Sequence, residues 1–236
     1  MLALVMLSTG CAHTVDGAAE AVTTALKVLP TEPEITGTAG NTLSTFGFQP
    51  FVGGVEILPD GYRTETDASP IGCVSVTDTA PRIVYEPLPV AEAARQSYFN
   101  WDEGVATSGA DAAAVQLSTA DAARDAFASF AKQWPDCDGT TVVKHLRLTG
   151  GDGGDSVIEA TVSDVAVDGP MLSATVRTRQ RPNAPASMYE RALGVRNQTI
   201  VEVSLAITPA GQRQPGPRDE AVRVAQVMLD KVGRGE

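Results

Sequence analysis

The second half of the chain alternates apolar with polar residues in a series of short segments. These segments are residues 140–148, 155–167, 171–180, 189–197 and 199–208. In the third of them the apolar positions are Leu172, Ala174 and Val176, which is the two-residue period of a β-strand. The links between the segments are short, whereas parallel pairing needs a crossover of about a dozen residues or more. The pattern therefore predicts an antiparallel sheet, and the alternation predicts that one face of it stays wet.

The segment that follows residue 118 has the longer period of an amphipathic helix. Its apolar residues recur at helical spacing on one face, at Ala123, Phe127, Phe130 and Trp134. Ser118 followed three residues later by Asp121 resembles a capping box, and Pro135 biases the residue before it away from helical angles. We therefore predict a helix that begins at Ser118 and ends at Pro135.

Two further helices are predicted near the ends of the folded part. Thr31, with Glu34 three residues later, predicts a short first helix because the two side chains can cap each other's backbone. Near the C-terminus, Asp219 and Glu220 suit a helix start and Lys231 suits a helix end, since these charges complement the helix dipole.

The remaining segments are less regular. Residues 72–77, which contain Cys73, alternate and predict a strand, and residues 111–118 predict another. Residues 90–101 have a helical composition but end in aromatic residues that suit a strand, so both interpretations stay open. Residues 40–70 are expected to lie irregularly against the body. Together the elements predict an α+β fold: a twisted antiparallel β-sheet with helices packed on one face.

Composition fits a globular domain with its own core. The chain has 236 residues, of which 43% are hydrophobic and 20% are charged. The net charge is -11, from 29 acidic and 18 basic residues. Nucleic-acid binding needs a basic face, so this class of function is disfavoured, as is adsorption to anionic lipid head groups.

The first residues resemble an export signal. An apolar run is followed by the small residues Ser8, Thr9 and Gly10 and then by Cys11, as in a bacterial lipobox whose cysteine is acylated. The run is short and no basic residue precedes it, so we expect residues 1–10 to be the remnant of a signal peptide with a truncated start. Cys11 would then carry a lipid anchor and residues 11–30 would be a tether. The alternative is an incidental cysteine in a buried strand or a disordered terminus.

Two cysteines remain if Cys11 carries lipid. In an oxidising compartment Cys73 and Cys137 favour a disulfide, which would close a loop of about 65 residues and stabilise the fold by about 4 kcal/mol. Two free buried thiols are an alternative, and a catalytic thiol assisted by His145 is another. No metal site is expected, because no CxxC pair occurs and the only histidines are His13 and His145.

Several of these segments together resemble a known family. They are the helix end Gln133-Trp134-Pro135 with Cys137, the segment "RALGVRN" at 191–197 and the helix start "AVRVAQVM" at 221–228. Over roughly residues 30 to 233 the chain closely resembles the PknH-like extracellular sensor domain of mycobacteria. That family occurs on a receptor kinase and, without a kinase, in acylated envelope proteins. We therefore assign residues 31–236 to one domain of this kind.

The resemblance carries its own expectations. It implies a Cys73–Cys137 disulfide and a sheet bent around a cleft suited to a ligand. Many members have a second disulfide, which joins a residue just before the "RAL" segment to one on the following strand. Residues 188–190 and 203–205 contain no cysteine, so this chain lacks that second bond.

Three arginines are the candidate ligand-binding residues. Arg177, Arg179 and Arg181 follow a strand period, so their guanidinium groups fall on one face and suit a carboxylate or phosphate partner. They suit cross-strand pairing with Asp and Glu equally well. Residues 150–158 match one copy of a calcium-binding β-roll repeat, but such sites need stacked copies, so a glycine-rich hairpin loop is favoured. His145 is interpreted as a surface residue of a strand.

The function expected from these observations is non-enzymatic. No Ser/His/Asp set and no nucleotide fingerprint occurs, and no cofactor is expected. We expect a lipoprotein on the outer face of the plasma membrane, whose sensor-like domain binds a small ligand or an envelope protein. A structural scaffold is the first alternative, and a lipid carrier between envelope layers is the second. A pocket with converging Arg, Tyr or Asp side chains would favour ligand binding, whereas a filled groove would favour a scaffold.

Overall fold

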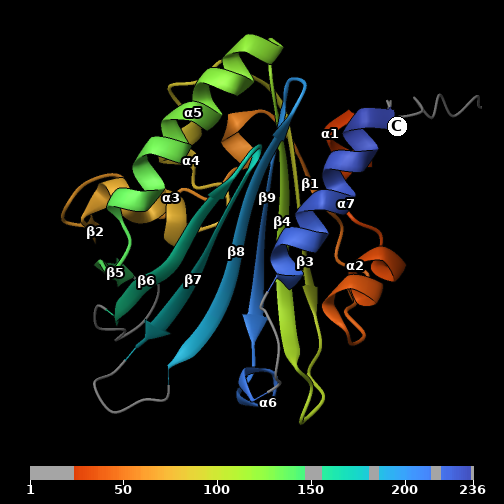
Figure 1. The fold of residues 1–236 in the computed structure, drawn as a ribbon, viewed down its shortest axis with the longest axis vertical. Helices are drawn as coiled ribbons and strands as arrows, with labels where there is room; N and C mark the ends of the chain where they lie inside the picture. The colour runs from red at the N-terminus through yellow and green to blue at the C-terminus, as the bar shows by residue number, and fades with distance from the viewer. Residues whose placement is uncertain (1–23, 147–155, 181–185, 214–218, 235–236) are drawn as a thin grey trace, which may run out of the picture.

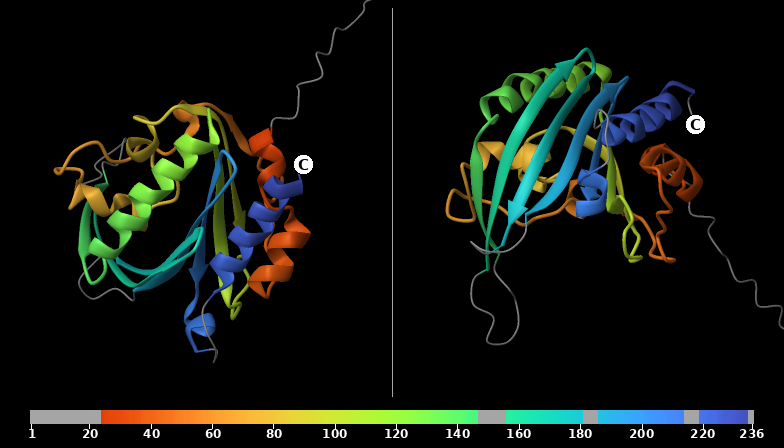
Figure 2. Two further views of the ribbon diagram at one scale, coloured as in Figure 1. Left: turned by 45° about the horizontal axis from the view of Figure 1, so that its top comes forward. Right: turned by 60° about the horizontal axis from the view of Figure 1, so that its bottom comes forward.

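A computed structural model of the chain describes residues 24–146, 156–180, 186–213 and 219–234. These residues form one nine-stranded sheet in the order β1-β3-β4-β9-β8-β7-β6-β5-β2, and every neighbouring pair is antiparallel (Figure 1). The sheet is strongly curved (Figure 2). The predicted antiparallel α+β fold is therefore confirmed.

The five strands of the second half agree with the alternating segments, whereas two short strands occur within residues 40–70, which were expected to be irregular. They are β1 (Phe51–Gly53), β2 (Ala68–Ser69), β3 (Val90–Phe99), β4 (Thr107–Leu117), β5 (Thr141–Leu146), β6 (Ser156–Asp168), β7 (Met171–Arg179), β8 (Ser187–Arg196) and β9 (Thr199–Ile207). The segment left open between helix and strand is β3. Strand β9 lies between β4 and β8, so the final hairpin of the sheet pairs with a strand from the first half of the chain.

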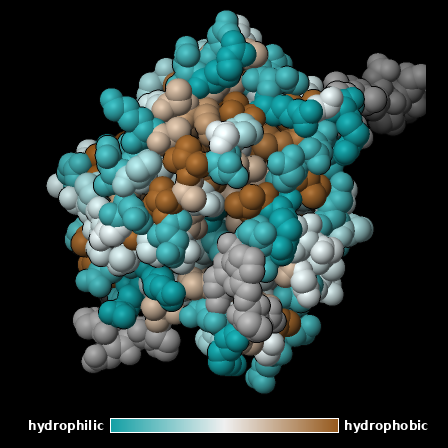
Figure 3. Space-filling model, in the orientation of Figure 1, coloured by the Kyte–Doolittle hydropathy of each residue, from teal (hydrophilic) through white to brown (hydrophobic). Residues whose placement is uncertain are grey.

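The helices are mostly short. They are α1 (Thr24–Val28), α2 (Glu32–Ala39), η1 (Val55–Ile57), η2 (Ile71–Cys73), α3 (Val74–Thr77), α4 (Arg82–Tyr85), α5 (Ala120–Asp136), α6 (Pro209–Gln212) and α7 (Glu220–Arg234). The two long helices α5 and α7 flank an apolar strip of the surface seen in Figure 3. Among the described residues, no helix is long and apolar enough to span a bilayer.

Helices cover both faces of the sheet, not the one face that was predicted. Along β4, Ala113 and Val115 belong to the apolar cluster that contains residues of α5, whereas Ala112 and Ala114 belong to the cluster that contains residues of α7. Successive residues of a strand point to opposite faces, so the two clusters lie on opposite sides of the sheet. We call these sides the α5 face and the α7 face. Apolar and polar residues alternate with the same period whichever face of a strand is buried. The sequence pattern therefore cannot tell on which face a helix packs.

The segment around Cys73 is helical, so the strand predicted at 72–77 is wrong. Residues 71–77 form η2 and α3, in which Val74, Ser75 and Val76 are all buried. This short helix lies between α5 and strands β6 and β7. The Val-Ser-Val alternation therefore reflects burial on all sides and not a strand with one wet face.

Helix α5 differs from its prediction at both ends. Its N-cap is Thr119 and not Ser118, because the Thr119 hydroxyl accepts a hydrogen bond from the Ala122 backbone N–H (3.1 Å). The helix continues through Pro135 to Asp136. A proline in the last turn removes one hydrogen bond there without ending the helix.

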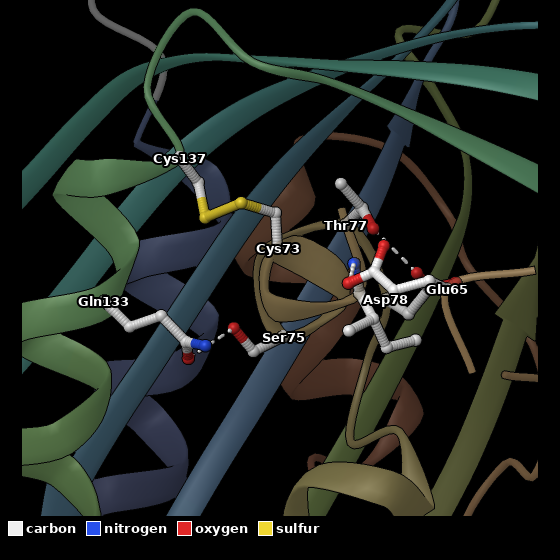
Figure 4. The surroundings of a disulfide bond; sticks show 8 residues. Glu65, Cys73, Ser75, Thr77, Asp78, Gln133 and Cys137 are labelled. Carbon is white, nitrogen blue, oxygen red and sulfur yellow. Dashed lines mark hydrogen bonds between the residues drawn. A yellow bond between two sulfur atoms is a disulfide. The ribbon is translucent and has the colours of Figure 1, made fainter. Parts of the chain in front are cut away.

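The disulfide joins η2 to the end of α5 (Figure 4). Cys73 and Cys137 are buried, and their Cα atoms lie 5.7 Å apart. The Ser75 hydroxyl lies 3.2 Å from the Gln133 side-chain oxygen, to which it donates a hydrogen bond. The bond leaves no free thiol at either position, so a catalytic cysteine in this part of the chain is excluded.

The folded body begins earlier than expected. Ala25, Val28 and Leu29 are buried, although the sequence placed residues 11–30 in a tether. The Ala25 backbone N–H also donates to the Glu92 carboxylate (3.1 Å). Helix α2 follows with the predicted capping box, in which Thr31 and Glu34 cap each other's backbone.

Candidate ligand-binding cleft

Part of the α5 face is not covered by helices and forms a cleft of about 540 Å³. It is lined by side chains from strands β3 to β9 and by the loops that contain Tyr62 and residues 77–79. This volume lies in the range of small-molecule sites. The cleft is open and concave, with polar and apolar groups in its wall.

The polarity of the α5 face changes along the strands. Nearest to α5, the apolar residues Val115 and Ile200 face the helix cluster. Two rows further along, Ser97, Asp111 and Ser204 lie opposite one another on β3, β4 and β9. Their row faces the cleft, because the helical cover has ended there. Hydrogen-bonding groups therefore occupy the positions that would be buried under a longer helix.

A buried ion pair contacts Asp78 and Thr79, two loop residues that line the cleft. Arg191 of β8 and Glu202 of β9 are 1% and 2% exposed, and the guanidinium donates to the carboxylate at 2.7 Å. Glu202 also accepts hydrogen bonds from the Tyr85 hydroxyl and from the Ala80 backbone N–H. Burial, with Glu202 nearby, raises the pKa of Tyr85 well above its ordinary value. Every member of this group is satisfied, so the group is structural.

The same arginine positions the loop above the cleft. Its remaining N–H groups donate to the backbone carbonyls of Val76, Asp78 and Val203 and to the hydroxyl of Thr79. The guanidinium also lies 6.0 Å from the centre of the Trp134 ring. This contact joins the Trp134 helix end to the "RAL" strand, two of the segments on which the family resemblance rests. Both segments therefore belong to one core.

Four charged side chains line the cleft. Lys144 forms an ion pair with Asp78 (2.5 Å), and its ammonium lies 5.4 Å from the centre of the Tyr62 ring. Arg95 donates to the Ile57 backbone carbonyl (2.9 Å), and Asp111 accepts from the Ser97 hydroxyl (2.5 Å). Within the described part of the chain, no ion pair joins Arg95 to Asp111. Both side chains line the cleft, where a ligand can contact them.

The surroundings shift the pKa of three side chains that line the cleft, Lys144, Arg95 and Tyr62. Burial lowers the pKa of Lys144, and the Asp78 carboxylate opposes that shift. Burial lowers the pKa of Arg95, with Asp111 acting in the other direction. Burial, with a smaller effect of Asp78, raises the pKa of the Tyr62 hydroxyl, so Tyr62 stays a hydrogen-bond donor at neutral pH.

The predicted arginines lie elsewhere. Arg177 and Arg179 are exposed on the α7 face, whereas the cleft is lined by Thr178 and Gln180 between and beyond them. In register, Arg179 lies opposite Glu159, as the alternative of cross-strand pairing expects. Arg181 lies outside the described residues. Binding by these arginines stays a prediction, and it would use the other side of the sheet.

Other candidate residues also fall outside the cleft. His145 is exposed on β5, as expected for a surface residue. Cys11 and the glycine-rich loop at 150–155 lie outside the described residues. In the described part of the chain, no group of three or more His, Cys, Asp and Glu side chains is placed to hold a metal ion.

Sequence reasoning missed the residues that line the cleft. Asp111 is the one charged residue in the segment "SGADAAAVQL", and a lone carboxylate in an Ala-rich strand is a usable signal. Lys144 follows Val142 by two residues and therefore shares its face, a signal that the strand period supplies. Ser97 and Ser204 gave no signal of their own, because their importance comes from register.

Comparisons with known proteins agree with this architecture. The profile of the family described as "PknH-like extracellular domain" matches residues 20–231. The crystal structure of the extracellular domain of PknH from Mycobacterium tuberculosis superposes with a TM-score of 0.69 at 18% identity, over 89% of this chain and 95% of that chain. At this identity the likeness establishes the fold alone. No curated protein matches the chain.

Proposed function

Because the chain belongs to the PknH-like extracellular domain family, we propose that it is a non-enzymatic sensor-like domain outside the plasma membrane that binds a small polar ligand in the cleft. The observation that carries the proposal is the cleft itself. Side chains of all three expected kinds converge in it: Arg95, Tyr62, Tyr189, Asp78 and Asp111. A structural scaffold would need no such space, since its groove could be filled.

The lining of the cleft also bears on the lipid carrier. Such a carrier needs a large apolar cavity, because an acyl chain offers no hydrogen bonds to the charged groups that it would desolvate. The cleft instead contains two acidic and two basic side chains together with several hydroxyl groups. This lining favours a ligand that can donate and accept hydrogen bonds.

We further propose that Cys11 is acylated and holds the domain at the outer face of the membrane. The support is the lipobox-like Ser8-Thr9-Gly10-Cys11 together with a family of extracellular domains. Labelling of cells with an alkynyl fatty acid tests this step. The wild-type chain should be labelled and the Cys11→Ala chain should not, whereas equal labelling of both would remove the anchor from the proposal.

A thermal-shift screen tests ligand binding. The Cys11→Ser chain is heated with a library of small polar molecules, and a ligand at about 100 times its Kd should add about 2.7 kcal/mol of stability by mass action. Asp111→Asn should abolish the shift, while the Arg177→Ala/Arg179→Ala double variant should retain it. The reverse pattern would place the ligand on the arginines of the α7 face and contradict the cleft.

A further inference from the structure

Five aromatic side chains gather beside the cleft in a protein that has few. We define the aromatic platform as Phe46, Phe48, Phe51, Phe99 and Trp101. Trp101 is 70% exposed and stacks on Phe46 with ring centres 4.2 Å apart and an interplanar angle of 10°. Phe99 lies between this stacked pair and Phe48, since the centre of its ring lies 6.1 Å from that of Trp101 and 6.2 Å from that of Phe48. Exposed aromatic surface of this extent is typical of a binding site.

The platform is held in place by hydrogen bonds. Ser44 pairs with Phe99 as an isolated β-bridge, and the Glu32 carboxylate accepts from the Ser44 hydroxyl and from the backbone and hydroxyl of Thr45. These hydrogen bonds, chiefly those from Thr45, lower the pKa of Glu32. Phe46 has a φ of +49° in the turn that follows. The loop that carries Phe46 is therefore held beside Phe99, and the exposed Phe46 ring stacks on Trp101.

The platform is continuous with the cleft. A smaller pocket of about 260 Å³ has Phe99 in its wall, and it shares Asp111, Tyr189 and Ser204 with the cleft. Small residues make this connection possible, because the row next to Asp111 contains Gly109 and Ala206. At the sheet edge, the Phe51 ring lies 4.0 Å from the Arg95 guanidinium, which also lines the cleft.

The charges of this surface suit a neutral ligand. Arg95 and Lys144 are balanced by Asp78 and Asp111, so the cleft carries no net charge and gives no advantage to a phosphate or a polyanion. The cleft presents hydrogen-bond donors and acceptors next to the flat apolar rings of the aromatic platform. A sugar ring presents hydroxyl groups at its rim and C–H groups on its faces, and it can satisfy both kinds of surface at once.

We propose that the cleft and the aromatic platform together bind a neutral oligosaccharide or polysaccharide chain. This inference rests on the proposed function and names the ligand class of the same site. Asp111 and Ser204 hydrogen-bond hydroxyl groups in the cleft, and Trp101 and Phe99 stack against sugar faces outside it. From Ser204 on β9 to Phe99 on β3 the surface crosses two strand spacings, about 10 Å, so the ligand spans more than one sugar ring.

A membrane surface fits the platform less well. Asp102 and Glu103 directly follow Trp101 in the β3–β4 hairpin, and anionic head groups repel acidic side chains at this position. A second copy of this acidic chain would meet the same repulsion. Both remain outcomes that the experiment must detect.

Native affinity electrophoresis of the Cys11→Ser chain tests the proposal. The gels contain an α-mannan, an α-glucan, a β-glucan, a galactan or, as the charged probe, hyaluronate. We expect at least one neutral polysaccharide to retard the chain. Trp101→Ala should raise the apparent Kd about tenfold or more, the loss expected for a central contact. Asp111→Asn should weaken retardation as well.

Matched variants separate binding from general effects. Val167→Ala removes an exposed apolar side chain elsewhere, and Asp125→Asn makes the same charge change on the exposed side of α5, so both should retain full retardation. Unchanged melting temperatures confirm that Trp101→Ala and Asp111→Asn fold. The glycan proposal is overturned by retardation in hyaluronate alone, by no retardation in any neutral polysaccharide, or by equal retardation of the wild-type and Trp101→Ala chains.

Three other results would also overturn it. Sedimentation with phosphatidylglycerol vesicles that depends on Trp101 would assign the platform to a membrane, and dimerisation that Trp101→Ala removes would assign it to a second copy. A thermal shift by a small molecule that Asp111→Asn abolishes, without any retardation by polysaccharide, would overturn the glycan and leave the proposed function standing.

Discussion

The two faces of the sheet are built from the same strands but differ in how far helices cover them. On the α7 face, the apolar residues of β3, β4, β8 and β9 meet α1, α2 and α7 and form a closed cluster. On the α5 face, helical cover ends part of the way along the strands, and the cleft begins there. Under this helical cover most alternate residues of these four strands are apolar. Where it stops, the same positions become polar, and the change marks the candidate site.

The charged residues of the α5 face divide in the same way. Arg191 and Glu202 are buried and paired, and the remaining N–H groups of Arg191 donate to the loop above the cleft, so the pair holds that loop. Arg95 and Asp111 lie on neighbouring strands and contact the ligand space. A charge that the fold satisfies is structural, whereas a charge left to solvent at the wall of a cavity is available for recognition.

The largest effect is expected at the buried pair. Arg191→Met leaves Glu202 buried without its cation, and this should lower the free energy of unfolding by about 3–5 kcal/mol. Urea unfolding at an unchanged m-value measures the change. The Arg191→Met/Glu202→Leu chain should lose less than the sum of the single losses, because the two side chains are coupled. A loss below about 1 kcal/mol in Arg191→Met would contradict the structural role.

The disulfide should come next. Replacing both members, Cys73→Ala and Cys137→Ala, opens a loop of 64 residues and should lower the free energy of unfolding by about 4 kcal/mol. Cys11→Ser serves as the control and should leave stability unchanged. Equal unfolding midpoints for the oxidised and reduced wild-type chain would show that the bond does not stabilise the body.

A smaller effect is expected from filling space on the closed α7 face. A methyl group at Gly194 would lie 2.8 Å from Leu229 Cδ1 and 3.1 Å from Met171 Cε. Both atoms are ends of flexible side chains, so Gly194→Ala should cost about 1 kcal/mol, the low end for overpacking. Thermal unfolding measures it. A stability gain would mean that this face has more free space than the structure indicates.

The smallest effect is expected in the open cleft. Asp111→Asn keeps the shape of an exposed side chain and should change the free energy of unfolding by less than about 0.5 kcal/mol. The same variant should abolish the ligand-induced thermal shift. A loss of several kcal/mol would class Asp111 with the structural residues and remove it from the site.

Much of the fold could be predicted from the sequence, because alternation and helical spacing are local properties. Residues 171–180 and 199–208 form strands, and the apolar spacing of Phe130 and Trp134 locates α5. The side of the sheet on which a helix packs depends on contacts between distant residues. The prediction that helices pack on one face only was therefore wrong. The strand at 72–77 was wrong for a related reason, since burial on all sides gave the same alternation.

The site was harder to predict than the fold. Ser97, Asp111 and Ser204 come together only because β9 pairs with β4, far away in sequence. The arginines at 177 and 179 show the opposite case. Their spacing correctly places them on one face, but the period of a strand does not state which face carries the cleft.

Alanine-methyl NMR of the Cys11→Ser chain, titrated with a ligand from the thermal-shift screen, tests most directly whether the uncovered part of the α5 face is the binding site. Ala113 and Ala206 lie at the cleft and its adjoining pocket, and Ala192 and Ala225 lie in the closed cluster of the α7 face. We predict saturable shifts of the first two methyl signals while the second two stay in place. Shifts confined to Ala192 and Ala225, or equal shifts of all four, would contradict the account.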